Sequence, residues 1–308
     1  MRTVFIYLVF PGLAATAAAG MMASWIERKL TARLQWRVGP PWYQPFADLL
    51  KLLSKETVFP RGCARGLFVA APLVGLASAA LVASMIGAAG LDPGRGFVGD
   101  LIVLVYLMML PSIALIAGGA ASRNTLASVG VSREMKLMMA YEAPMILAIL
   151  VPVIKAGVTI STGGIVAYQR LHGPFAASPS GALAFAAALL CAQAKLGLPP
   201  FDIAEAETEI NAGPLVEYSG PLLAAFRLTR MMLLVALPCL LLTLFAGGVR
   251  FYGWGAARSV LGYAAILLLM TLIKNTNPRL RIDQALRFFW FPVTAAAAAA
   301  VLLALAGR

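Results

Sequence analysis

The sequence is poor in the residues that hold metals and redox cofactors. It contains 3 cysteines and 1 histidine in 308 residues. Cys63, Cys191 and Cys239 lie far apart along the chain, and His172 forms no ligand spacing with any of them. Zinc and iron–sulfur sites need cysteines and histidines in pairs or at short spacings. We therefore expect no metal, no iron–sulfur cluster and no other cofactor to be bound by this chain.

Charged residues are also scarce. Only 12% of the residues are charged and 61% are hydrophobic, which excludes a soluble globular domain of ordinary composition. Apolar runs close to the length of about 20 residues that spans a bilayer recur along the whole sequence. The sequence therefore predicts an all-α polytopic membrane helix bundle, organised as a single transmembrane domain over residues 1–308.

Hydropathy predicts about eight transmembrane helices. They cover roughly residues 3–26, 67–90, 101–121, 137–154, 181–198, 221–245, 259–273 and 293–306. Fifteen of the 25 lysines and arginines fall in connections that this topology assigns to the cytoplasm, and six fall in outer segments. The positive-inside rule therefore places both termini outside. The same topology explains the net charge of +12 by contact with the lipid bilayer, without a nucleic-acid partner.

The segment from Lys195 to Gly220 departs from this pattern. It carries five of the chain's 13 acidic residues, namely Asp202, Glu205, Glu207, Glu209 and Glu217. Asp202 followed by Glu205 resembles a helix N-cap and its partner three residues later, and the segment from 211 to 214 contains stop residues. A short acidic helix is therefore expected, with Glu205 and Glu209 repelling each other on one face and Glu207 pointing elsewhere. An acidic cytoplasmic loop without a further role is the alternative interpretation.

A second carboxylate lies inside an apolar run. Glu142 falls one to two turns into the run from 137 to 154, where an unpaired charge costs a few kcal/mol. Pro144 follows it, and a broken helix beside a carboxylate often borders a hydrated cavity. These features predict a functional role for Glu142. For Glu134, expected in the preceding loop, an ion pair with its neighbour Arg133 is a sufficient explanation.

Several cations are candidate partners of these carboxylates. Arg227 and Arg230 lie on one face of the helix expected at 221–245. Two roles are open for them. They form ion pairs with Glu142 or with the acidic helix, or they extend to the membrane interface. In the first cytoplasmic connection an amphipathic helix begins at Pro45; its Lys51 is an interfacial anchor, whereas Asp48 should be ionised and paired.

Five motifs carry a resemblance to a known family. They are ERKLTARLQWRVGP and QPFADLLKLLSKE after the first helix, REMKLMMAYEAP at the fourth, PFDIAEAETEINAGPLVEYSG after the fifth, and NPRLRIDQALRFFW before the last. Together they resemble the membrane subunit of respiratory complex I that lies under its peripheral arm, known as the H-type subunit. The resemblance covers nearly the whole chain.

Two stretches depart from the quinone-reducing members of that family. This chain reads SREM where those members typically have an alanine- and glutamine-containing stretch, and FRLTRMM where they carry a Glu-Tyr pair. In these positions it looks more like the homologous subunit of energy-converting membrane-bound nickel–iron hydrogenases and formate hydrogenlyases.

The resemblance implies a coupling function in a prokaryotic cell membrane. Such a subunit docks soluble hydrogenase-like large and small subunits and an iron–sulfur subunit, and it contacts antiporter-like membrane subunits. The partners would carry the iron–sulfur clusters and a nickel–iron site. Carried over by motif, the coupling region consists of Asp48, Glu134, Glu142, Asp202, Glu205, Glu207, Glu209 and Glu217 with Arg37, Lys51, Arg133, Arg227 and Arg230. A quinone-binding subunit of NADH-quinone oxidoreductase and, with less support because no internal repeat occurs, an independent transporter are the alternatives.

Overall fold

A computed structural model describes residues 2–95 and 98–307, and the regular structure in this part of the chain is helical throughout. The helices are α1 (Arg2–Leu8), α2 (Leu13–Leu34), α3 (Gln44–Leu53), α4 (Arg65–Leu91), α5 (Asp100–Ala121), α6 (Thr125–Lys155), α7 (Thr162–His172), α8 (Pro179–Lys195), α9 (Glu207–Ile210), α10 (Gly220–Phe245), α11 (Gly253–Thr276), α12 (Ile282–Phe288) and α13 (Thr294–Leu305). Short 3₁₀ turns lie at Pro93–Arg95, Phe175–Ala177 and Gly213–Leu215, and a π-helical stretch at Phe289–Val293 joins α12 to α13. The predicted all-α membrane bundle is confirmed.

Seven helical runs in the described residues are long and apolar enough to cross a membrane. They are Phe5–Leu34, Arg65–Leu91, Asp100–Ala121, Thr125–Lys155, Gly220–Phe245, Gly253–Thr276 and Ile282–Leu305. The remaining expected helix, predicted at 181–198, is α8. It has 17 residues and ends at Lys195, three residues earlier than predicted. It ends early because the Gly and Pro residues at 197–200 do not continue a helix.

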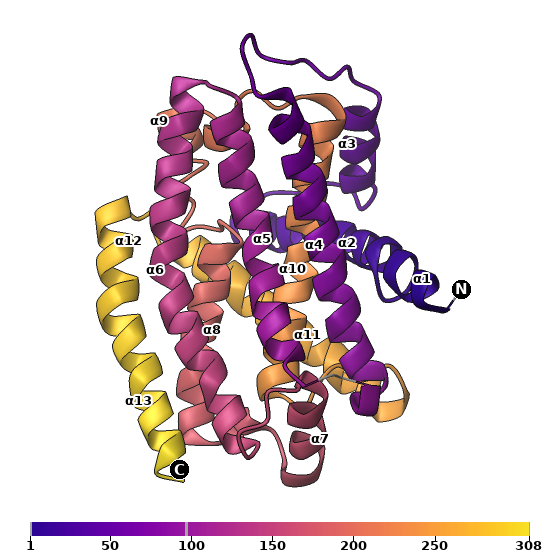
Figure 1. Cartoon of the computed structure of the whole chain (residues 1–308), viewed down its shortest axis with the longest axis vertical. Helices are drawn as coiled ribbons and strands as arrows, with labels where there is room; N and C mark the ends of the chain where they lie inside the picture. Colours follow the sequence, from indigo (N-terminus) through magenta and orange to yellow (C-terminus); the bar gives the residue numbers. More distant parts are fainter. Residues whose placement is uncertain (1, 96–97, 308) are drawn as a thin grey trace.

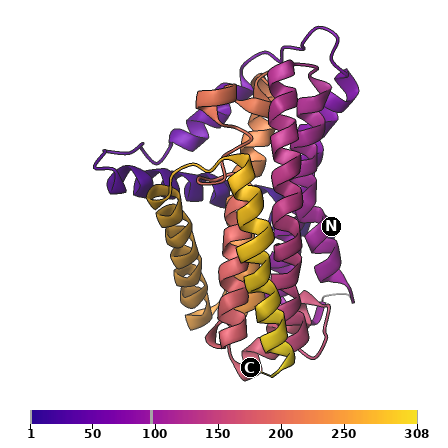
Figure 2. The same ribbon diagram turned by 90° about the vertical axis from the view of Figure 1, so that its left-hand side faces the viewer.

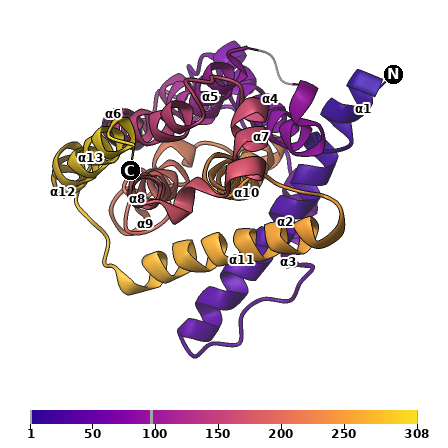
Figure 3. The same ribbon diagram turned by 90° about the horizontal axis from the view of Figure 1, so that it is seen from below.

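The bundle is built around α10. Helices α4, α5, α6, α8, α10 and α13 run nearly parallel, as Figures 1 and 2 show. Of the most apolar stretch of α10, 78% is buried, compared with 22% for α11. Seen from below, α11 and α2 cross one side of the bundle and leave their outer faces uncovered (Figure 3). These faces are available to lipid or to neighbouring subunits.

The two ends of the bundle differ in what covers them. Helices α3 and α9 lie at one end, which carries the basic connections expected in the cytoplasm (Figure 1). The C terminus and α7 lie at the other end, so the Gly- and Ser-rich segment expected to be an outer loop contains a helix. Below we call these the cytoplasmic end and the outer end.

The expected cytoplasmic loop from 122 to 136 is mostly helical. Helix α6 begins at Thr125, where the side chain of Asn124 accepts a hydrogen bond from the Leu126 amide and caps the helix. Glu134 is consequently a buried helical residue, and its expected position in a loop was wrong. The apolar pattern alone did not show this, because the first turns of α6 carry polar side chains that resemble a solvent-exposed connection.

Candidate functional site

The acidic segment folds differently from its prediction. Its helix, α9, spans only four residues, is preceded by Ala206 at the N-cap position, and does not include Glu205. The predicted Asp202 cap and the shared face of Glu205 and Glu209 were therefore wrong. The side chain of Glu207 lies outside the described residues. The local N-cap pattern was overridden because the carboxylates bind arginines that are distant in sequence.

Three arginines from different elements hold the acidic segment. Arg279, in the linker between α11 and α12, lies 3.1 Å from Asp202. Arg133 of α6 lies 2.6 Å from Glu209 and pairs with it rather than with its sequence neighbour Glu134. Arg230 of α10 pairs with Glu205 and also donates a hydrogen bond of 2.6 Å to the Gly197 carbonyl oxygen. The segment is thus fastened to α6, α10 and the α11–α12 linker by charge-assisted contacts.

The end of the acidic segment rests in a notch between α5 and α6. A side-chain carbon on Gly130 would lie 2.6 Å from Pro214 Cδ, and one on Gly119 would lie 2.9 Å from Pro214 Cβ, so only glycine permits this approach. Tyr218 stacks on Phe68 with ring centroids 4.1 Å apart and donates its hydroxyl to the Phe68 carbonyl oxygen at 3.0 Å. Burial raises the pKa of Tyr218, which keeps this donor protonated.

Deeper in the bundle, Glu142 of α6 forms an ion pair with Lys195 at the end of α8. The two residues are 8% exposed each, so Lys195 does not reach the interface as a flanking lysine would. Its Nζ atom also lies 5.2 Å from the ring centroid of Tyr141. The second carboxylate oxygen of Glu142, Oε2, is buried and has no hydrogen-bond partner among the described residues. A buried pair with one oxygen free is an acceptor for a proton or a water molecule.

Glu134 lies between this pair and the acidic segment. It is buried, about two turns before Glu142 on the same helix. It is close enough to interact with the charges of Glu205, Arg230 and Lys195. The structure therefore brings together a series of charged side chains that runs from the cytoplasmic end, at the Glu205–Arg230 pair, through Glu134 to the Glu142–Lys195 pair.

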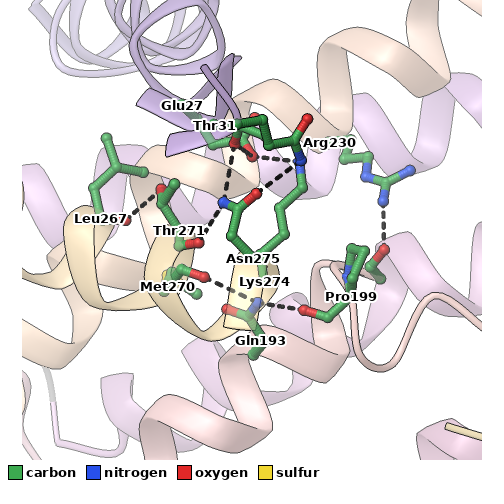
Figure 4. Close-up of polar contacts among 12 residues, drawn as sticks. Glu27, Thr31, Gln193, Pro199, Arg230, Leu267, Met270, Thr271, Lys274 and Asn275 are labelled. Atoms are coloured by element: carbon green, nitrogen blue, oxygen red, sulfur yellow. Dashed lines mark hydrogen bonds and ion pairs between the residues drawn. The ribbon is translucent and has the colours of Figure 1, made fainter. Parts of the chain in front are cut away.

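A further ion pair, between the buried Glu27 and the half-buried Lys274, links α2 to α11 and was not revealed by the sequence. Figure 4 shows Lys274 pointing toward Glu27, with Nζ and Oε1 2.6 Å apart, and Asn275 beside Thr31. Glu27 is 7% exposed. In the same view the buried Gln193 donates to the carbonyl oxygens of Pro199 and Met270. Glu27 and Lys274 each lie at the end of an apolar run, so each resembled an ordinary flanking charge.

The other predicted site residues lie apart from this series. Asp48 is 3.5 Å from Arg28 and accepts a hydrogen bond of 2.8 Å from Gln44, so its expected pairing is observed. Glu217 accepts a hydrogen bond from Asn124. Arg37 and Lys51 are exposed. Arg227 is also exposed and makes no ion pair within the described residues, so of the two α10 arginines only Arg230 contacts the acidic segment.

A polar cavity of about 240 Å³ opens at the cytoplasmic end. Its walls come from the acidic segment, α6 and the start of α12, and its charged lining residues are Arg133, Asp202, Glu209, Arg279, Arg281 and Asp283. The described residues contain no group of three or more His, Cys, Asp or Glu side chains that could hold a metal ion. The arrangement of ion pairs and partly exposed charges is suited to moving or storing charge.

Comparison with known proteins identifies the family. The family model described as NADH dehydrogenase matches residues 6–305. The chain is 34% identical over 276 residues to the H-type subunit of NADH-quinone oxidoreductase from Geobacillus kaustophilus, and the match covers 86% of this chain and 82% of that protein. The chain belongs to the NADH dehydrogenase family, the family of these complex I subunits. This complex I-type protein is also 32% identical to the equivalent subunit from Bacillus mycoides, over 92% of this chain and 89% of the relative.

A solved structure extends the comparison to a complex of another kind. A chain of the membrane-bound sulfane sulfur reductase, an archaeal respiratory membrane complex, superposes with a TM-score of 0.87 at 27% sequence identity. The match covers 99% of this chain and 100% of that one. The protein is therefore a multi-pass membrane subunit of a multi-subunit respiratory complex of the complex I type.

Proposed function

We propose that this subunit anchors a soluble redox arm to the membrane and couples the chemistry of that arm to proton or sodium translocation. The observation that carries the proposal is the series of charged side chains from Glu205 and Arg230, which are half-buried, to Glu134, Glu142 and Lys195, which are buried. Buried charges are costly unless they are paired, and intramembrane carboxylates commonly mark ion or proton pathways. The whole chain acts as one transmembrane domain in this proposal.

The acidic segment is the element that transmits the change. It lies at the cytoplasmic end, where a docked arm would meet it, and three of its carboxylates are held by arginines from three elements. A displacement of the segment separates Glu205 from Arg230, and the freed arginine then interacts more strongly with Glu134. Approach of a positive charge favours the ionised form of a carboxylate and its withdrawal favours the neutral form. A redox-driven movement in the arm is thereby converted into proton uptake or release inside the bundle.

We infer the type of complex from the two stretches in which this sequence differs from the quinone-reducing members of the family. Glu134 lies in the SREM stretch and Arg230 in the FRLTRMM stretch, the two places where the chain differs from the quinone-reducing pattern. We therefore assign it to an energy-converting hydrogenase-type complex, with soluble large and small subunits, an iron–sulfur subunit and antiporter-like membrane subunits as partners. The full-length similarity to a chain of a sulfane sulfur reductase supports a complex other than NADH-quinone oxidoreductase.

A quinone-binding subunit of complex I is the second candidate. The observation that favours it is the name of the curated relatives at 31–34% identity, which are H-type subunits of NADH-quinone oxidoreductase.

One experiment separates the two candidates. The complex is isolated through a tag on this chain and reconstituted in sealed vesicles, and electron transfer is measured with and without added quinone while a pH or sodium gradient is recorded. Gradient formation that is independent of quinone, in a complex whose large subunit binds nickel, is the expected result. NADH-driven quinone reduction would establish the second candidate in its place.

A further inference from the structure

A second cavity lies at the outer end of the bundle, far from the charged series. It has a volume of about 110 Å³ and lies between the end of α10, the following loop and the first half of α11. Its polar lining consists of Arg250, Arg258 and Ser259, and the rest is glycine, alanine and leucine. No carboxylate of the described chain lines it, so two cations face a small space without a counter-charge.

The position of Arg250 is fixed by its neighbours. Its amide donates a hydrogen bond of 2.8 Å to the Ser259 hydroxyl, which itself donates to the Gly255 carbonyl oxygen at 2.9 Å. The side chain then passes directly over Gly255, where an added Cβ would lie 2.5 Å from Arg250 Cδ. Arg250 is thus held against α11 through contacts that leave its guanidinium group free to bind a ligand.

Positive charge at this end extends beyond the cavity. Arg170 of α7 donates to the Gly90 carbonyl oxygen at 3.2 Å. Partial burial lowers the pKa of Arg170, and the positive charge of Arg250 lowers it further, as expected for two cations at the same end of the bundle that repel each other. An anion placed among these arginines would relieve that repulsion.

The cavity lies beside an exposed apolar face of α11. Helix α11 lies at the edge of the bundle in Figure 3. Tyr252 and Trp254, just before and after the start of α11, are 80% and 92% exposed, and Val260 and Leu261 are 67% and 70% exposed. Exposed Tyr and Trp side chains are typical of the headgroup level of a membrane, and exposed Val and Leu side chains are typical of the acyl-chain level. The arginines therefore lie at the depth of lipid phosphate groups.

We propose that this cavity binds the phosphate group of an anionic phospholipid of the outer leaflet, held by Arg250 and Arg258, with the acyl chains lying along α11. Paired guanidinium groups match the geometry of a phosphate, and basic pockets between membrane helices are suited to lipid headgroups. The site supports the packing of α11 on α10 at the outer end and takes no part in the charge transfer proposed above.

Native mass spectrometry of the delipidated full chain in detergent tests this site. The probes are phosphatidylglycerol, phosphatidylcholine with the same acyl chains, and inorganic phosphate. We expect one phosphatidylglycerol to bind in preference to phosphatidylcholine, and Arg250→Gln/Arg258→Gln to weaken that binding roughly 30-fold, since each arginine contributes about 1 kcal/mol near an anionic membrane surface. Arg61→Gln/Arg287→Gln, which removes two exposed arginines at the cytoplasmic end, is the matched control and should bind as the wild type does.

Other outcomes overturn the proposal. If the Arg250→Gln/Arg258→Gln variant binds phosphatidylglycerol as tightly as the wild type does, the two arginines do not hold the lipid. If phosphatidylglycerol and phosphatidylcholine bind equally, the site does not recognise an anionic headgroup. Binding of inorganic phosphate that blocks phosphatidylglycerol at equal concentration would assign the site to free anions. If the glutamine variant does not fold, Arg250→Lys/Arg258→Lys replaces it: the charge remains but paired hydrogen bonding is lost, so an intermediate affinity is expected and wild-type affinity would contradict the geometry.

Discussion

At the scale of single residues, the Glu142–Lys195 pair is the most informative contact. Both side chains are buried, so removal of either leaves the other charge without its partner. From the sequence alone Glu142 was recognisable as a candidate site residue, because a glutamate inside an apolar run is costly. Its partner was not recognisable, because Lys195 resembles a lysine at a helix end and only the fold brings α8 beside α6.

We predict that Glu142→Gln lowers ion translocation in sealed vesicles by at least about tenfold while electron transfer in the soluble arm, measured with an artificial donor, continues. The reason is that glutamine keeps the shape of the side chain but cannot exchange a proton. The double variant Glu142→Gln/Lys195→Met removes both charges of the pair and should also leave the complex assembled, with translocation as low as in the single variant. Translocation at the wild-type rate in Glu142→Gln vesicles would show that Glu142 is only a packing residue.

The two arginines of α10 provide a matched comparison. Arg230 pairs with Glu205 and binds the Gly197 carbonyl oxygen, whereas Arg227 is exposed three residues earlier on the same helix. We predict that Arg230→Gln lowers translocation about tenfold or more and that Arg227→Gln changes it less than about twofold, because only Arg230 holds a charge-assisted contact to the acidic segment. The same vesicle assay measures both. Similar losses in the two variants would contradict a specific role for the Glu205–Arg230 pair.

At the scale of elements, the sequence predicted what depends on local composition and missed what depends on distant partners. The apolar runs indicated the membrane helices because hydrophobic length is a local property. The acidic helix was misplaced since the Asp202 N-cap pattern is local, whereas the arginines at 133, 230 and 279 that bind its carboxylates lie on elements far away in the sequence. The early start of α6 was missed because its first turns are polar in sequence. Glu134 is nevertheless buried, since the fold packs other helices against it.

The notch between α5 and α6 that holds Pro214 leads to a prediction about how the acidic segment docks. We predict that Gly130→Ala weakens docking of the acidic segment, because the new carbon would lie 2.6 Å from Pro214 Cδ and 2.8 Å from Pro214 N. Overpacking of this kind costs about 1–3 kcal/mol. Limited proteolysis between residues 202 and 212 should become faster. Gly66→Ala, which meets no atom within 4 Å, is the control; equal proteolysis rates in both variants would show that the notch does not hold the segment.

At the scale of the whole molecule, charge is separated between the two ends. Fifteen of the 25 lysines and arginines lie in segments assigned to the cytoplasmic end. The acidic segment is the exception at that end, and three of its carboxylates, those of Asp202, Glu205 and Glu209, are paired with Arg279, Arg230 and Arg133. A docking partner therefore meets a mainly basic end of the bundle, and the long connection between α2 and α4 extends outward from the helices there (Figure 2).

The scarcity of cysteine and histidine leads to a prediction for the isolated protein. We predict that the purified chain contains no stoichiometric iron or nickel and has no redox activity of its own, because its three cysteines are separated and its described residues offer no metal-binding group. Metal analysis and optical redox titration of the isolated chain measure this. One iron or nickel atom or more per chain would show that the redox centre is not confined to the partner subunits.

The basic connection after α2 should bind the soluble arm. Arg33, in the last turn of α2, and Arg37, just after the helix, are exposed, and this positive charge is more than orientation in the membrane requires. We predict that Arg33→Glu/Arg37→Glu lowers recovery of the soluble arm with the membrane subunit about tenfold or more at low ionic strength, because a complementary acidic surface would be repelled. Membrane insertion of the later helices should be unchanged, since many other cytoplasmic cations remain. Arg33→Lys/Arg37→Lys, which keeps both positive charges, is the matched control and should leave recovery of the arm unaffected. Normal recovery with the glutamate variant would place the docking contact on another face, and an equal loss with the lysine variant would show that charge does not carry the contact.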